Sequence, residues 1–168
     1  MGVFWRGYVA HSYGEAPMKF IVDFLINGPE RLSAWFAWLP PLFARIVVGW
    51  VFMWSGWGKL NALDRITQNF VEWGIPFPHI MTPFVSGVEF FGALLLLLGL
   101  FTRVAAVPLV ITMIVAIISA KLADVDSLET LLGFEEIAYM ALFGWLAVAG
   151  PGPVSLDHVL QRWSAQQA

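Results

Sequence analysis

Glu89 is the residue whose position most clearly calls for chemistry. It lies inside a long apolar run, Met81–Phe101, which reads MTPFVSGVEFFGALLLLLGLF. A run of about 20 apolar residues can cross the ~30 Å hydrocarbon core of a bilayer. A carboxylate at that depth costs roughly 2.5–3.5 kcal/mol on insertion scales, so it needs a partner, a proton or a function. Glu89 is therefore a candidate for proton exchange, for hydrogen bonding to a ligand, or for an ion pair inside the membrane.

Other charged residues lie near the ends of the apolar runs, and their spacing indicates which of them share a helix face. Arg45 and Lys59 are fourteen residues apart (45 to 59), as are Glu89 and Arg103 (89 to 103), which is close to four helical turns. Antiparallel helices would bring several charges into the half of the membrane that holds Glu89, namely Lys59, Lys121, Glu135 and Glu136. Arg45 and Arg103 would lie at the other end, near the Asp157 tail.

Two interpretations of these charges stay open at this point. The cationic side chains can extend to the lipid headgroups, and Glu135 and Glu136 can be ordinary acids in the first turn of a helix. Glu89 differs because a short carboxylate cannot reach the membrane surface from two turns inside. We expect Glu89 to face the protein interior, with Lys59 as its leading partner.

Three tryptophans form a second candidate feature. Trp50, Trp54 and Trp57 recur at helical spacing and share one face. Such a row is typical of a lipid-facing interfacial belt, and it could also stack against a flat lipophilic ligand such as a quinone.

The composition excludes several other kinds of chemistry. The chain has no cysteine, so it cannot supply a thiolate or ligate an iron–sulfur cluster. Its three histidines, at positions 11, 79 and 158, lack metal-ligand spacing, so we expect no metal site. The net charge is −3 and no basic run is present, which gives no support for nucleic-acid binding.

The elements that position these residues are membrane-spanning helices. The 168 residues are 59% hydrophobic and 12% charged, whereas soluble domains average about 25% charged residues. The pattern predicts an all-α integral membrane four-helix bundle over residues 41–153, with crossings at about 41–57, 81–101, 104–120 and 136–149. Residues 154–168 read as a short polar tail helix. Residues 1–40 read as an aromatic arm followed by an interfacial amphipathic helix over Arg31–Leu39.

The basic residues predict an orientation. The side with both termini would carry Arg6, Lys19, Arg31, Arg45, Arg103 and Arg162, against Lys59, Arg65 and Lys121 on the opposite side. The excess favours cytoplasmic termini in a multi-pass protein. The length of the aromatic arm leads us to expect that it docks another subunit of a membrane complex.

Several stretches resemble the DoxX family of small bacterial membrane proteins. These are ARIVVGWVFMWSGWGKL (Ala44–Leu60), WGIPFP (Trp73–Pro78), VEFFGALLLLLGLFTRVAAVPL (Val88–Leu109) and GPGPVSLD (Gly150–Asp157). The resemblance implies a four-helix bundle in the bacterial inner membrane, related to subunits of thiosulfate:quinone oxidoreductases or to partners of oxidoreductases in redox defence. It also implies charged positions at Arg45, Lys59, Glu89, Arg103 and Asp157. Some relatives depend on cysteines, which this chain lacks.

Two functional hypotheses follow from the sequence. The first is an accessory subunit of a quinone-linked redox complex, not catalytic by itself, with a quinone or lipid site near Glu89. The second is a non-catalytic scaffold in a larger membrane complex, in which the charges lock the helices together. A transporter is disfavoured, because inverted repeats and broken helices at corresponding positions are missing.

Overall fold

The computed structural model describes residues 24–25 and 28–167, which belong to two units, 1–37 and 38–168. The described part of the first unit contains helix α2 (Gly28–Trp35), with Pro29 in its first turn. The sequence predicted a helix over residues 31–39. The observed helix lies earlier, and Leu39 begins the next one. The predicted aromatic arm at the start of the 1–40 segment falls within residues 1–23, which lie outside the described residues.

The second unit begins with α3 (Leu39–Leu60), which extends the predicted crossing 41–57 at both ends. Prolines in its first turn suit a helix start, where no internal N–H bond is lost. Its buried residues follow helical spacing, so one face packs inward: Pro41, Ala44, Arg45, Val48, Gly49, Phe52 and Gly56.

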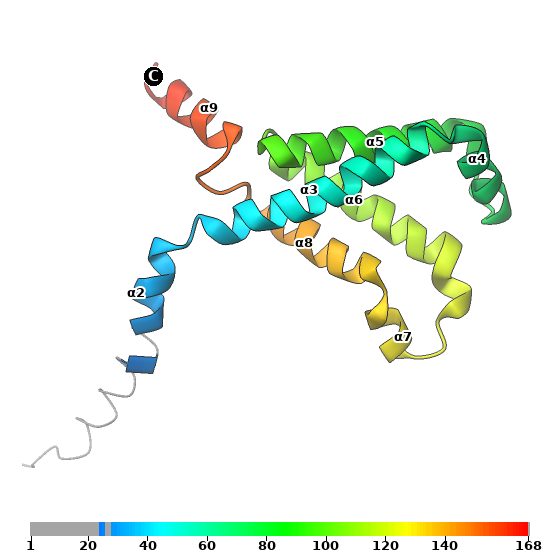
Figure 1. Ribbon diagram of the computed structural model, residues 1–168, viewed down its shortest axis with the longest axis horizontal. Coiled ribbons are helices and arrows are strands. Elements are labelled where there is room, and N and C mark those ends of the chain that lie inside the picture. Colours follow the sequence, from blue (N-terminus) through cyan, green and yellow to red (C-terminus); the bar gives the residue numbers. More distant parts are fainter. Residues whose placement is uncertain (1–23, 26–27, 168) are drawn as a thin grey trace, which may run out of the picture. The chain divides into compact units, whose positions relative to one another are not determined.

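Helix α5 (Pro78–Leu98) runs antiparallel to α3 and packs along it (Figure 1). It lies three residues earlier than the predicted crossing 81–101. Pro78 starts the helix, and Gly99 ends it in the left-handed conformation (φ 64°). Gly56 lies at the crossing of the two helices, where an added Cβ would come within 2.5 Å of the Phe90 backbone nitrogen. A glycine is therefore required for this close approach.

Helix α6 (Thr102–Ala116) continues through a π-helical segment, Ile117–Lys121, and a 3-10 turn, Leu122–Asp124. Helix α8 (Glu135–Ala149) then packs against α6. Phe52 of α3 makes edge-to-face contacts with Tyr139 and Phe143 of α8, at centroid distances of 5.0 and 4.9 Å. The four helices α3, α5, α6 and α8 share one apolar core.

The all-α prediction is confirmed for the described residues, which contain no strand. Three helical stretches have the length and hydropathy to cross a membrane: Leu39–Leu60, Pro78–Leu98 and Thr102–Asp124. Helix α8 has 15 residues, a length of about 22 Å, which is short for a ~30 Å hydrocarbon core. A fourth crossing at α8 therefore stays a prediction.

Three shorter helices complete the described chain. Helix α4 (Leu63–Glu72) connects α3 to α5 and buries Thr67 and Phe70. Helix α7 (Leu128–Gly133) precedes α8, and α9 (Leu156–Ala165) forms the tail. Neither α4 nor α7 was predicted from the sequence.

Candidate functional site at Glu89 and Lys59

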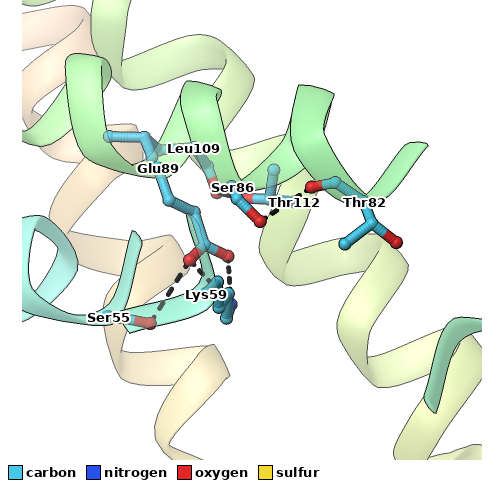
Figure 2. A network of polar contacts seen from close by, with 7 residues as sticks. All are labelled: Ser55, Lys59, Thr82, Ser86, Glu89, Leu109 and Thr112. Atoms are coloured by element: carbon cyan, nitrogen blue, oxygen red, sulfur yellow. Dashed lines mark hydrogen bonds and ion pairs between the residues drawn. The ribbon is translucent and has the colours of Figure 1, made fainter. Parts of the chain in front are cut away.

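Glu89 is buried between α3 and α5 in contact with a lysine and a serine (Figure 2). The Lys59 Nζ lies 2.6 Å from each carboxylate oxygen of Glu89, and Ser55 Oγ donates to Oε2 at 3.3 Å. The Glu89 side chain is 3% exposed, whereas the Lys59 side chain is 32% exposed. The anion is thus enclosed by the protein, while part of the cation stays accessible.

Local sequence explains why these side chains meet. Ser55 and Lys59 are one helical turn apart on α3, so they present their polar atoms on one face. On α5 the buried positions Thr82 and Ser86 share the face of Glu89. Both hydroxyls donate within the helix, Thr82 Oγ1 to Pro78 O at 2.8 Å and Ser86 Oγ to Thr82 O at 2.7 Å. Glu89 instead interacts with Ser55 and Lys59 on α3.

The ion pair forms the polar end of an apolar cavity of about 330 Å³. The volume lies within the ~300–1,000 Å³ typical of ligand pockets. The cavity is lined from α3, α4, α5, α6 and the residues that follow α4: Lys59, Phe70, Ile75, Met81, Phe84, Val85, Val88, Glu89, Pro108, Ile111, Thr112, Val115 and Ala116. Phe84, Ile111 and Val115 are also exposed on the outer surface of α5 and α6. The cavity therefore borders the surface that faces lipid in a membrane.

A second ion pair connects the π-helical segment after α6 to α8. Lys121 Nζ lies 2.7 Å from Glu136 Oε1 and 5.1 Å from the centre of the Phe134 ring. Glu135 instead accepts a 3.4 Å hydrogen bond from Tyr139. Among residues 24–25 and 28–167 no hydrogen bond or ion pair joins this group to Glu89. The charges that the sequence placed in the same half of the membrane thus form two separate ion pairs.

Arg45 lies at the opposite end of α3, where the C-terminal segment returns to the helices. It is 1% exposed and donates from Nε to Pro41 O at 3.3 Å and from Nη2 to Val154 O. Nearby, the Asp157 carboxylate accepts from the Phe101 and Thr102 backbone N–H groups at 2.7 and 3.0 Å. Asp157 therefore caps the start of α6 and holds the tail segment against it.

The tryptophan row lies on the outside of α3. Trp50, Trp54 and Trp57 are 49–56% exposed. Trp54 and Trp57 line a separate groove of about 240 Å³ with Met53 and Phe90. They do not line the cavity that ends at Glu89. Within the described part of the chain no group of three or more His, Cys, Asp or Glu side chains is placed to hold a metal ion.

Sequence reasoning missed Ser55, Phe70 and Thr112 as residues of this region. The spacing of Ser55 and Lys59 was available as a signal, since the two residues are four positions apart. Phe70 follows Leu63 and Ile66 in an apolar pattern of period three to four within an otherwise polar segment. Thr112 carried no comparable signal in the sequence. In the structure its hydroxyl donates to Leu109 O within α6.

Comparisons with known proteins agree on one family for this chain. The DoxX family model matches residues 41–122. "Inner membrane protein YqjF" of Escherichia coli (strain K12) is 31% identical over 124 residues, covering 72% of this chain and 92% of that protein. "Uncharacterized membrane protein Rv3486" of Mycobacterium tuberculosis (strain ATCC 25618 / H37Rv) is 36% identical over 129 residues, covering 70% and 79%. "Putative oxidoreductase CatD" of Bacillus subtilis (strain 168) is 30% identical over 118 residues, covering 69% and 83%. No solved structure matches the chain.

Proposed function

The chain belongs to the DoxX family of membrane proteins, and from that premise we propose that it is an accessory subunit of a quinone-linked redox complex. The complex would lie in the bacterial inner membrane, and the quinone headgroup would bind beside Lys59 and Glu89. The observation that carries the proposal is the apolar cavity of about 330 Å³ that ends at this ion pair. The word oxidoreductase in the name of the Bacillus relative points in the same direction.

The residues at the end of the cavity suit a quinone headgroup. The partly exposed Lys59 ammonium has three N–H donors, and the two close contacts to Glu89 leave donor capacity for a quinone carbonyl oxygen. The apolar walls would hold the ring and the first part of the isoprenoid chain. Because the cavity borders the lipid-facing surface, a quinone would enter it without passing through water.

Reduction of a quinone to a quinol takes two electrons and two protons. In our proposal the electrons come from a partner subunit that carries a flavin or a metal centre. One proton would pass from Lys59 Nζ to the nearer quinone oxygen, and water reaching the exposed part of Lys59 would return a proton to it, while Glu89 would hold the Lys59 side chain at the site. The second proton comes from water at the membrane surface. The partner would contact residues 1–40, and both termini would face the cytoplasm.

Blocking the cavity tests this proposal. The bulky substitution Ile111→Trp places a ring at the cavity wall, and Ile114→Trp makes the same change on α6 outside the lining. We expect Ile111→Trp to lower the quinone extracted with the purified protein and the quinone reduction rate of native membranes, while Ile114→Trp leaves both unchanged. Equal quinone content in the two variants would overturn the quinone site.

A scaffold role is the second candidate, and the two ion pairs favour it. Each pair joins two helical segments: Lys59–Glu89 joins α3 to α5, and Lys121–Glu136 joins the π-helical segment after α6 to α8. Under this hypothesis Glu89→Gln would reduce the amount of assembled complex on native gels and leave the turnover of the remaining complex unchanged. Under the quinone hypothesis the same variant would assemble normally and turn over more slowly.

A further inference from the structure

A second cavity lies at the other end of the helices, beside the tail helix α9. It has a volume of about 200 Å³ and is lined by Arg103, Ala149, Pro151, Gly152, His158 and Gln161. Unlike the cavity at Glu89, most of its wall consists of polar side chains and helix-end backbone. Arg103 is the second residue of α6, so the cavity lies where a membrane-spanning helix begins.

The polar groups around this cavity have unused hydrogen-bonding capacity. The Arg103 guanidinium makes one long hydrogen bond, from Nη2 to Ala149 O at 3.4 Å. The His158 Nε2 is buried without a partner among the described residues. Either ring nitrogen of a histidine can carry the proton, so Nε2 can donate to an anion. A buried polar atom without a partner is unfavourable, and a ligand that accepts its hydrogen bond would remove that cost.

The local electrostatics favour a negative ligand. His158 lies in the first turn of α9, a ten-residue helix whose N-terminal end carries partial positive charge. Arg162 follows one turn later on the same face. The nearby Asp157 carboxylate opposes an anion, but its oxygens are already bonded to the Phe101 and Thr102 N–H groups.

Helix α9 also has the surface of a helix that lies on a membrane. Its exposed apolar residues recur at helical spacing and form one stripe, Leu156, Val159, Leu160 and Trp163. The sequence predicted a short polar helix here and did not indicate this apolar stripe. The start of α9 is fixed at the end of the spanning helices, because the Asp157 N–H donates to Gly99 O at 2.9 Å. An amphipathic helix that starts at this level can bury its apolar stripe in the headgroup region.

We propose that the cavity beside α9 binds the phosphate group of an anionic phospholipid. Arg103, His158 and Gln161 supply the hydrogen bonds, and the apolar stripe of α9 inserts beside the acyl chains. The position of the cavity at the end of a spanning helix selects a lipid phosphate over a free phosphate in solution. The proposal is independent of the quinone site, with which this cavity shares no lining residue.

The first test measures lipid binding to the full chain in nanodiscs with and without phosphatidylglycerol. Gln161→Glu places a negative charge on the cavity wall, and Gln167→Glu makes the same change further along the tail. We expect phosphatidylglycerol to raise the melting temperature of the wild type and of Gln167→Glu. The apparent affinity of phosphatidylglycerol should be about ten- to hundredfold weaker for Arg103→Gln, which removes a charged hydrogen bond, and for Gln161→Glu, whose negative charge repels the phosphate. Equal stabilisation of wild type and Gln161→Glu would overturn the site.

Two further measurements distinguish a lipid phosphate from a free phosphate and locate α9 at the membrane interface. Inorganic phosphate should give no comparable stabilisation in nanodiscs without phosphatidylglycerol, and equal protection by phosphate would overturn the lipid assignment.

Because the chain has no cysteine, single-cysteine variants can carry an environment-sensitive probe. A probe at Val159→Cys should show a blue-shifted emission relative to one at Ala165→Cys, on the opposite face of α9. Matching spectra would overturn the interfacial position of the helix.

Discussion

Lys59 Nζ lies 2.6 Å from both carboxylate oxygens of Glu89, although the two residues are 30 positions apart in the chain. The pair joins a buried anion to a partly exposed cation, with side-chain exposures of 3% and 32%. The partners are thus unequal. Lys59 can extend toward water when Glu89 is replaced, whereas Glu89 stays buried when Lys59 is replaced.

This inequality predicts different effects on stability at the two positions. Lys59→Met should destabilise the protein by about 3–5 kcal/mol, because it leaves a buried carboxylate without its cation. Glu89→Gln should cost about 1 kcal/mol, because the amide oxygen can still accept from Lys59. Thermal unfolding in one detergent measures both. A larger loss for Glu89→Gln than for Lys59→Met would contradict the geometry.

The contact between α3 and α5 predicts opposite outcomes for two neighbouring glycines. Gly56→Ala should cost about 1–3 kcal/mol, because its Cβ would meet the Phe90 backbone at 2.5 Å. Gly58→Ala, with nothing within 4 Å, should be neutral or slightly stabilising, because alanine favours a helix. The melting temperatures of the two variants check this. Equal destabilisation would argue that the helices do not approach so closely.

The turn between α5 and α6 predicts the effect of a substitution at Gly99. An alanine there would adopt an unfavourable left-handed conformation, and its Cβ would lie 1.7 Å from Arg45 Nη1. We expect Gly99→Ala to release the C-terminal segment, seen as faster proteolysis after residue 150 and a lower melting temperature. Gly144→Ala in α8, where the added Cβ meets nothing within 4 Å, is the matched control and should resist proteolysis like the wild type.

The separation of the two ion pairs predicts additive effects. Glu89→Gln and Lys121→Gln should each lower stability, and the double variant should equal their sum within about 0.3–0.5 kcal/mol. Thermal unfolding of the two single variants and the double variant gives the coupling energy. A coupling of about 1 kcal/mol or more would contradict the separation and show that the two ion pairs act as one group.

The sequence was most informative about the spanning helices and the partner of Glu89. Long apolar runs located α3, α5 and α6, and antiparallel order brought Lys59 to the depth of Glu89. The helix ends were less accurate: the end of α5 depends on the left-handed turn at Gly99 rather than on hydropathy. Helix α4 was missed because its few apolar residues mark one face of an otherwise polar segment.

The cavity itself could not be predicted from the sequence. Its shape depends on how Phe70 of α4, Pro108 of α6 and the α5 side chains pack, and these contacts come from segments far apart in the chain. The division of the charges into two ion pairs also depends on contacts between segments far apart in the chain. Lys121 is the last residue of the π-helical segment and meets Glu136 on α8, a contact that the order of the helices alone does not favour over one with Glu89.

The exposure of Ile111 and Val115 at the cavity wall has a consequence for any measurement of binding there. A molecule that enters from the bilayer is in equilibrium with its amount per lipid, and not with its concentration in water. Adding empty vesicles at constant total ligand should therefore lower the occupancy of the cavity, although the aqueous volume is unchanged. Affinities for this site are comparable between preparations only when they are expressed as mole fractions in the membrane.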